Sequence, residues 1–268
     1  MALITPIVAA GQTSSPLLTD APLCLLAGRV VDYQPGGPWK NLGTAGDALD
    51  AEVVSQPDFV DDTSGGPGFK REIPEPTPPH RPRVGTFDNR MFDIPGSLLA
   101  PGDTDPFTVT IATTPLYPHP ESVRYLWKYS NTSLPPSPAG LVIENVATFP
   151  NGDDVGHGLI AAIYNGPLAT PPTFLGGANP PDDIQRTRQV LALRYDPEPV
   201  PPATDGAVTV WRNGTTFVPL PALITEPGPW IDTTDIRIGS GQICHAVVWH
   251  DRALTDTEMA DLSDLLLH

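Results

Sequence analysis

The sequence predicts an all-β protein: a two-sheet antiparallel sandwich with a short C-terminal helix and an extended N-terminal arm. The chain holds 35 prolines and 24 glycines without a compositional period, which is typical of many loops between short strands. Asn213-Gly214 separates two β-branched and aromatic runs, and both central residues of a type I′ hairpin turn need φ > 0. Ile243–Trp249 is a nearly continuous apolar run, which indicates a central strand.

Residues 1–20 are predicted to form an arm that precedes a single domain over residues 21–268. The arm carries four apolar residues that a solvated tail would not need: Leu3, Ile4, Ile7 and Val8. We therefore expect an assembly arm that orders on a neighbouring subunit. A flexible terminus is the alternative, because the first residues of many domains are poorly ordered.

The expected strands share either a continuous apolar run or apolar and polar alternation, and they number about twelve. The clearest, in chain order, are Pro22–Ala27, Asp50–Val53, Met91–Ile94, Phe107–Ala112, Arg124–Tyr129, Gly140–Val146, Gly158–Tyr164, Gln189–Tyr195, Ala207–Arg212, Thr215–Val218, Thr234–Gly239 and Ile243–Trp249. Residues 61–83 interrupt this pattern, because their prolines and glycines exclude a central strand. We predict a Pro-rich internal loop there, with a boundary between two domains as the alternative.

The last residues predict a helix that packs on the sheet. Thr255 and Glu258 have the spacing of a capping box, in which each side chain satisfies a free backbone donor at the helix start. Leu254 and Met259 are placed for a hydrophobic staple around this cap. Met259, Leu262 and Leu266 share one helical face.

Short motifs at both ends of the chain follow one another in a recognisable order. They are Trp39-Lys40-Asn41-Leu42-Gly43, Trp211-Arg212-Asn213-Gly214, Ile238-Gly239, Val247-Val248-Trp249 and Arg252-Ala253-Leu254-Thr255-Asp256-Thr257-Glu258. Their order resembles that of the laminin-G-like, concanavalin A-type jelly rolls, a superfamily of lectins, glucanases and adhesion modules. The resemblance implies that the first and last strands are neighbours. A Cys24–Cys244 disulfide is then conceivable, with two buried thiols as the alternative.

Composition excludes several classes of partner. The formal net charge is −16 and the pI is about 4.5, so a nucleic-acid backbone or an anionic membrane surface would be repelled. No apolar run is long enough to cross a bilayer, so we expect no membrane insertion. Residues 1–20 contain no Lys or Arg and therefore lack the basic region of a signal peptide. We expect synthesis in the cytoplasm without export.

No catalytic constellation is found in the sequence, and we predict that the protein is not an enzyme. A retaining glycosidase needs two carboxylates about 5 Å apart, and no strand carries paired glutamates at that spacing. Asp232 and Asp235 are three residues apart and would point to opposite sheet faces. The chain also lacks a nucleophile elbow, a P-loop, a dinucleotide fingerprint and a zinc-protease motif.

Two kinds of binding site are considered. The family resemblance implies a calcium site on a loop rim, for which Asn151, Asp153 and Asp154 are the best candidates; solvated turn residues are the alternative. We expect no other cofactor. A carbohydrate site needs aromatic platforms on exposed loops, and Trp39, Tyr117 and Trp230 stand beside Gly or Pro turns. The alternative is that these three rings cap the edge of the core.

The chain as a whole resembles minor tail and other surface proteins in the virions of phages that infect high-GC actinobacteria. The resemblance implies a non-enzymatic structural and adhesion protein, made in the host cytoplasm and oligomeric in the virion. Its partners would be other virion proteins and, through a carbohydrate-binding role in host attachment, host cell-surface glycans. A free-standing lectin or a glycan-active enzyme of the same fold is one alternative. A capsid or tail decoration protein without a ligand is another.

Overall fold

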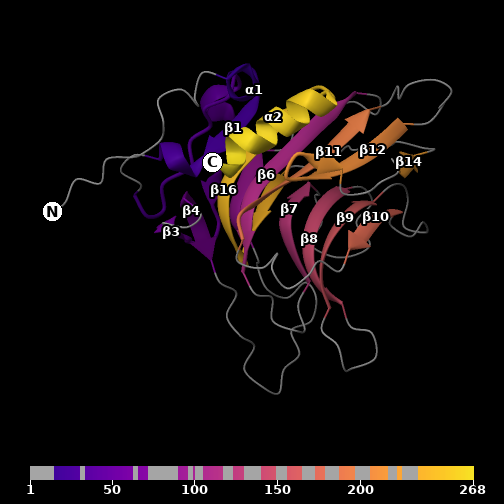
Figure 1. The fold of residues 1–268 in the computed structure, drawn as a ribbon. Helices are drawn as coiled ribbons and strands as arrows, with labels where there is room; N and C mark the ends of the chain where they lie inside the picture. Colours follow the sequence, from indigo (N-terminus) through magenta and orange to yellow (C-terminus); the bar gives the residue numbers. More distant parts are fainter. Residues whose placement is uncertain are drawn as a thin grey trace.

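The protein is an all-β sandwich of two antiparallel sheets with a C-terminal helix, as predicted (Figure 1). The computed structural model describes residues 15–30, 34–62, 66–71, 90–95, 99, 105–116, 123–129, 140–148, 156–164, 173–178, 187–196, 206–216, 222–224 and 235–268. None of the helices in these ranges is long and apolar enough to cross a membrane.

Sheet 1 has nine strands within the described residues. Its neighbours run in the order β13 (Thr215–Thr216), β12 (Gly206–Arg212), β11 (Gln189–Asp196), β6 (Phe107–Pro115), β16 (Gln242–His250), β4 (Gly66–Arg71) and β3 (Asp58–Asp62), with β1 (Leu23–Leu26) also beside β16 and β14 (Ala222–Ile224) beside β12. The turn between β12 and β13 has positive φ at both Asn213 and Gly214, which confirms the predicted type I′ hairpin.

Sheet 2 has seven strands in the part of the chain that is described. Its order is β10 (Thr173–Ala178), β9 (Gly156–Tyr164), β8 (Gly140–Thr148), β7 (Val123–Tyr129), β15 (Asp235–Gly239), β5 (Arg90–Pro95) and β2 (Glu52–Val53). Two short 3₁₀ helices, η2 (Ala27–Arg29) and η3 (Gly46–Leu49), stand between β1 and β2 in the chain.

The first and last strands are neighbours, as the resemblance implied. β1 runs antiparallel to β16, with Leu23 opposite Trp249 and Leu25 opposite Val247. β4 pairs with the start of the same edge of β16, where Cys244 lies opposite Phe69. Segments from both ends of the chain therefore build one sheet.

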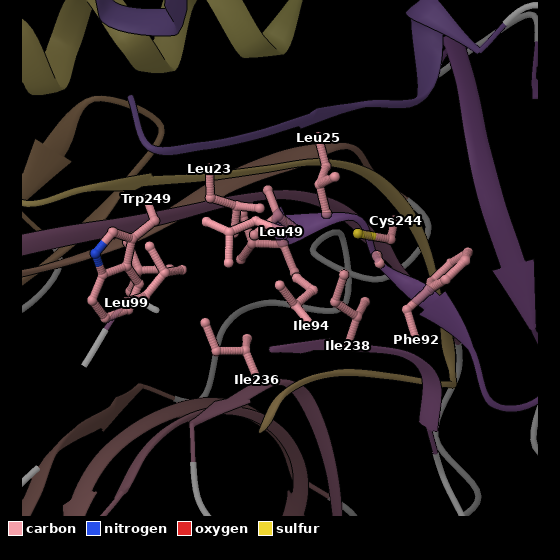
Figure 2. Packing of buried hydrophobic residues seen from close by; sticks show 14 of the residues in the cluster. Leu23, Leu25, Leu49, Phe92, Ile94, Leu99, Ile236, Ile238, Cys244 and Trp249 are labelled. Carbon is pink, nitrogen blue, oxygen red and sulfur yellow. The ribbon is translucent and has the colours of Figure 1, made fainter. Parts of the chain in front are cut away.

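An apolar core fills the space between the sheets. In Figure 2, Leu23 and Leu25 of β1 point toward Ile94 and Ile238 of sheet 2, and all four side chains are fully buried. The inward positions of β6 and β11 belong to the same cluster, so these strands alternate between two faces. Burial of this apolar surface is the main force that holds the sheets together.

Helices cover the outer face of sheet 1 at β1, β6, β11 and β16, so these strands are buried on both faces. α1 (Pro16–Thr19) and α2 (Asp256–Leu267) form a second apolar cluster with it, and α2 lies across β6, β16 and β11 in Figure 1. The predicted helix face is confirmed, because Met259, Leu262 and Leu266 are all buried in this cluster.

The predicted capping box at the start of α2 is also confirmed. The Thr255 side chain accepts from the Glu258 backbone N–H, and the Glu258 carboxylate accepts from the Thr255 backbone N–H. The Arg252 guanidinium donates to both Glu258 carboxylate oxygens. These bonds lower the pKa of Glu258 to about 2, first through Arg252 and then through the Thr255 backbone.

The packed body begins earlier than the predicted boundary at residue 21. Ser15 caps α1, and Leu18 is buried against the second cluster. The His250 Nε2–H donates to the Leu17 carbonyl oxygen over 2.9 Å. The end of the predicted arm is therefore a docked helical turn, while Leu3, Ile4, Ile7 and Val8 lie outside the described residues.

The Pro-rich loop predicted over residues 61–83 is wrong at its start, because β3 and β4 form an antiparallel pair there. The glycines and proline of this segment predicted a loop and not β4. A Cβ at Gly68 would overlap the Ile243 side chain, so only glycine allows this close approach to β16. The Pro67 carbonyl accepts from the His245 Nδ1–H over 2.9 Å. Residues 72–83 lie outside the described residues.

Cys24 and Cys244 are free, buried thiols, which confirms the alternative to a disulfide. Cys24 packs in the helix-side cluster, whereas Cys244 packs between the sheets. A bulge in β16 between Cys244 and Ala246 changes the face to which Cys244 points. The two thiols therefore stand on opposite faces of one sheet. Burial raises the pKa of the Cys24 thiol to about 12 and also raises that of Cys244.

The loop after Trp39 closes the free edge of β1. The Asn41 Oδ1 accepts from the Cys24 backbone N–H over 2.8 Å, and the Leu42 N–H donates to the Cys24 carbonyl over 2.8 Å. A Cβ at Gly43 would overlap the carbonyl oxygens of Ala21 and Pro22. The Asn-Leu-Gly motif thus satisfies a strand edge that would otherwise remain unpaired.

Candidate functional site

The structure corrects the prediction that Trp39 is an exposed carbohydrate platform. The ring is 1% exposed and packs against Phe69 and Phe92, at centroid distances of 4.8 and 5.5 Å. An aromatic platform must offer a free face to a sugar, and both neighbours belong to the core. Trp39 therefore takes the alternative role of a core residue, because its apolar surface is more stable there than in water.

The other predicted site residues lie outside the described residues and stay predictions. They are Tyr117 and Trp230 for carbohydrate, and Asn151, Asp153 and Asp154 for calcium. In the described part of the chain, no three His, Cys, Asp or Glu side chains are grouped as metal ligands.

The strand ends beside these residues can nevertheless be placed. β15 ends at Gly239 and β16 begins at Gln242, so the two sheets are joined at one end of the sandwich, toward the bottom of Figure 1. We call this end the loop end: β4, β6 and β8 finish there, and β5, β7, β9 and β11 begin there.

Two of the predicted sites fall on connections at this loop end. Tyr117 directly follows Leu116, whose N–H donates to the Gly241 carbonyl over 3.0 Å. Residues 151–154 lie between Thr148 and Gly156, which face each other in the β8–β9 ladder. Trp230 instead lies between β14 and β15, whose facing ends are at the opposite end of the sandwich.

Polar side chains gather at the loop end of the described structure. The Arg71 guanidinium donates to the Ser240 hydroxyl over 3.1 Å and to the Arg90 carbonyl over 3.5 Å. Arg90 in turn forms an ion pair of 2.6 Å with Asp93. These bonds tie β4, β5 and the turn between β15 and β16 together.

Three neighbouring strands carry a row of polar side chains at this end, which we call the inner polar row: Gln189, Thr113 and Gln242. Each is at most 1% exposed. The Thr113 hydroxyl donates to the Gln242 Oε1 over 2.6 Å, and the Gln242 Nε2 donates to the Gly239 carbonyl over 2.8 Å. Alternation with Leu191 in β11 and Ile111 in β6 places the row on the core side of sheet 1.

Sequence reasoning missed this row, although a signal was present. Gln189 continues the inward series Leu191, Leu193 and Tyr195, and Thr113 continues the inward series that ends at Ile111. A polar residue in phase with a core series marks a buried polar position. The predicted strand, however, ended at Ala112, so Thr113 was left outside it.

A second polar group lies on the helix side of the same strands. The Thr114 Oγ1 and the His245 Nε2 are 2.8 Å apart. The Arg188 Nη2 donates to the Leu266 carbonyl at the C-terminal end of α2. A positive charge there is stabilising, because it lies beside the negative end of the helix dipole. Burial lowers the pKa of Arg188. The Arg188 bond helps to hold α2 on the sheet, whereas the Thr114–His245 contact joins β6 to β16.

No protein-family model matches the sequence, and no curated protein matches it. Among solved structures, the receptor-binding domain of botulinum neurotoxin D superposes with a TM-score of 0.59 at 8% identity, over 92% of this chain and 53% of that one. The botulinum neurotoxin serotype G binding domain gives a TM-score of 0.51 at 14% identity, over 92% and 51%. A botulinum neurotoxin DC binding domain, solved in complex with rat synaptotagmin II, gives 0.57 at 9% identity, over 91% and 51%.

At sequence identities this low, the comparisons show only that the folds are similar. The chain spans about half the length of the binding domains that it matches. The chain therefore shares the jelly-roll-like β-sandwich fold of these domains.

Proposed function

We propose that this chain is a non-enzymatic structural and adhesion protein of a phage virion, and that its loop end contacts carbohydrate at the host surface. The observation that carries the contact role is the convergence of strand ends at the loop end. The connections 72–89, 117–122, 149–155 and 179–186 all join strand ends there. Loops on a packed scaffold are where proteins most often place binding residues.

The two faces of sheet 1 support this choice. Its inner face belongs to the core, and its outer face is covered by α1 and α2 over a continuous apolar cluster. A partner cannot reach the apolar clusters on the two faces of β1, β6, β11 and β16 without displacing packed side chains. Within sheet 1, contact is therefore left to strand edges and loop ends.

Net charge narrows the chemistry of the partner. With a formal net charge of −16, the chain repels polyanions, so neutral glycans are better partners than teichoic-acid-like or nucleic-acid polymers. The placement in a virion rests on the family resemblance of the sequence, and the assembly role of the arm rests on its apolar residues. The fold shared with receptor-binding domains is compatible with adhesion.

A glycan array combined with a hydrolysis assay tests the proposal. We expect retention of neutral glycans without release of sugar. Replacement of residues 149–155 by a Gly-Ser linker of the same length should abolish retention, whereas the same replacement of 165–172 at the opposite end should not. Adding calcium or a chelator checks the Asn151, Asp153 and Asp154 prediction in the same assay.

Other outcomes would select other functions. Sugar release would make the protein a glycan-active enzyme. Absence of both binding and release would remove adhesion and leave a decoration protein. Immunoblots of purified phage particles check the virion placement, and absence of the chain from particles would favour a free-standing lectin.

A further inference from the structure

The Gln189 side chain is buried and has no hydrogen-bond partner among the described residues. It is 1% exposed, and neither its Oε1 nor its Nε2 makes a hydrogen bond with any of them. It lies opposite Thr113 in the β11–β6 ladder, whose hydroxyl is already engaged as a donor to Gln242. The amide therefore faces the core side of the loop end with two donors and one acceptor unused.

A buried amide in this state is costly, because it loses its bonds to water and gains none in return. Native proteins satisfy nearly all buried polar side chains with protein groups or ordered water. Gln189 could have been an apolar residue like Leu191 and Leu193, the next inward positions of β11. Its presence indicates a partner other than the described residues.

Among the described residues, no charged side chain lies beside Gln189. Arg71 is the charged side chain on the inner side of the described loop end, and it already donates to Ser240 and Arg90. It lies on β4, three strands from β11, which is roughly 14 Å at normal strand spacing. Arg188 points to the opposite face of the sheet, toward α2.

A neutral position with free donors and a free acceptor suits a group that both donates and accepts. An ion would need an opposite charge, and an apolar group would leave the amide unpaired. A hydroxyl group meets the requirement, since its oxygen accepts from the Gln189 Nε2 and its hydrogen donates to the Oε1 or to a lone pair of Thr113 Oγ1.

We propose that Gln189, together with the Thr113 oxygen, forms a hydroxyl-binding position inside the loop end of the sandwich. The hydroxyl belongs either to a buried water molecule or to a sugar. This position goes beyond the proposed function, because its test in the absence of sugar does not depend on glycan binding.

The first experiment measures chemical denaturation of the full chain carrying Gln189→Met, without sugar. Methionine has nearly the same shape but makes no strong hydrogen bond, so a bound hydroxyl predicts a lower denaturation midpoint than in the wild type. Without sugar, an unchanged or higher midpoint rules out a buried water, since removal of a truly unpaired amide relieves its cost. The same result in the presence of the glycosides named below would overturn the proposal.

Thr110→Val is the matched control. Thr110 is a buried residue of β6 whose hydroxyl also has no partner, and it points to the helix side of the sheet. The control should keep or raise the midpoint. An equal loss in both variants would indicate a general packing effect and would count against the hydroxyl.

A measurement on the wild type serves if Gln189→Met does not fold. The ε-amide protons of Gln189 should show a nuclear Overhauser contact to a long-lived water, or shift when methyl galactoside, mannoside or rhamnoside is added. A contact with water identifies the buried water, and a shift with a glycoside identifies a sugar hydroxyl. Absence of both signals would overturn the proposal.

Discussion

At the scale of single residues, the Asn41 side chain makes four hydrogen bonds to backbone groups of the loop and of the segment that contains β1. Its Oδ1 accepts from the backbone N–H groups of Cys24 and Gly43, and its Nδ2 donates to the carbonyls of Pro22 and Gly46. It thereby replaces a neighbouring strand on the free edge of β1. The sequence motif that suggested a family is explained here by hydrogen bonding.

Asn41→Ala should lower the free energy of unfolding by about 2 kcal/mol, because it leaves the buried Cys24 N–H without a partner. Lys40→Ala is the control in the same loop. The Lys40 side chain is 60% exposed, so its ion pair with Asp50 is screened by water and should contribute far less to stability than the Asn41 bonds. Urea denaturation measures both, and equal losses would contradict the edge role of Asn41.

His250 makes stability depend on pH at the contact between α1 and β16. Burial is the main reason that the pKa of His250 lies below its ordinary 6.5; the Leu17 carbonyl opposes this shift, Arg252 adds to it, and Asp251 and Glu258 oppose it. The unfolded chain thus binds the proton more readily than the folded one. Stability should be complete above about pH 6.5 and fall as the pH drops through the lowered value.

His250→Gln tests this dependence, since the glutamine amide can still donate to Leu17 but does not titrate in this range. Plots of melting temperature against pH between 7.5 and 5 should differ in slope, with the melting temperature of the wild type falling more steeply toward acid pH. Parallel curves would show that another group controls the response.

At the scale of secondary-structure elements, α2 is the best predicted part of the chain. Its cap and its staple are local features, and the sequence contains both partners within a few residues. Its docking site is not local, since Arg188 and Arg194 reach the helix ends from β11 and its preceding turn. Arg194 also stacks on Trp211 at 5.4 Å.

Thr255→Ala should destabilise the protein by about 1 kcal/mol, because it removes the acceptor for the Glu258 N–H at the first turn. Thr257→Ala changes the same residue type two positions later, at an exposed site inside the helix. It should have little effect or be slightly stabilising. Differential scanning calorimetry distinguishes them, and equal effects would argue against the cap.

β4 shows how element prediction fails. Its glycine and proline content predicts a loop, and the strand exists because β16 offers a partner 170 residues away in the chain, as the Gly241 N–H to Arg71 carbonyl bond shows. Gly68 is needed for close packing, and Pro67 contributes a carbonyl acceptor to His245. Single-residue preferences cannot report such a tertiary partner.

At the scale of the whole molecule, the N-terminal segment divides into two parts. Deletion of residues 1–14 removes none of the described contacts, so the free energy of unfolding should change by less than about 0.5 kcal/mol. Deletion of residues 1–20 removes buried Leu18 and the carbonyl bonded to His250, and should cost about 2 kcal/mol or more.

Light scattering on the same two truncations checks the proposed assembly role of Leu3, Ile4, Ile7 and Val8. If the arm holds neighbouring subunits together, the shorter truncation should already reduce the assembly size while leaving stability intact. An unchanged size would remove that role. A stability loss with the shorter truncation would show that residues 1–14 also contribute to the packed body.

The sequence by itself determined the fold class, the hairpin at Asn213-Gly214 and the cap of α2, because turn chemistry, alternation and capping depend on neighbours in the chain. Tertiary structure alone decided the burial of Trp39, the strand at β4, the opposite faces of the two cysteines and the inner polar row. Each of these depends on which distant strand lies alongside, and on one bulge in β16 that changes the face of the residues before it.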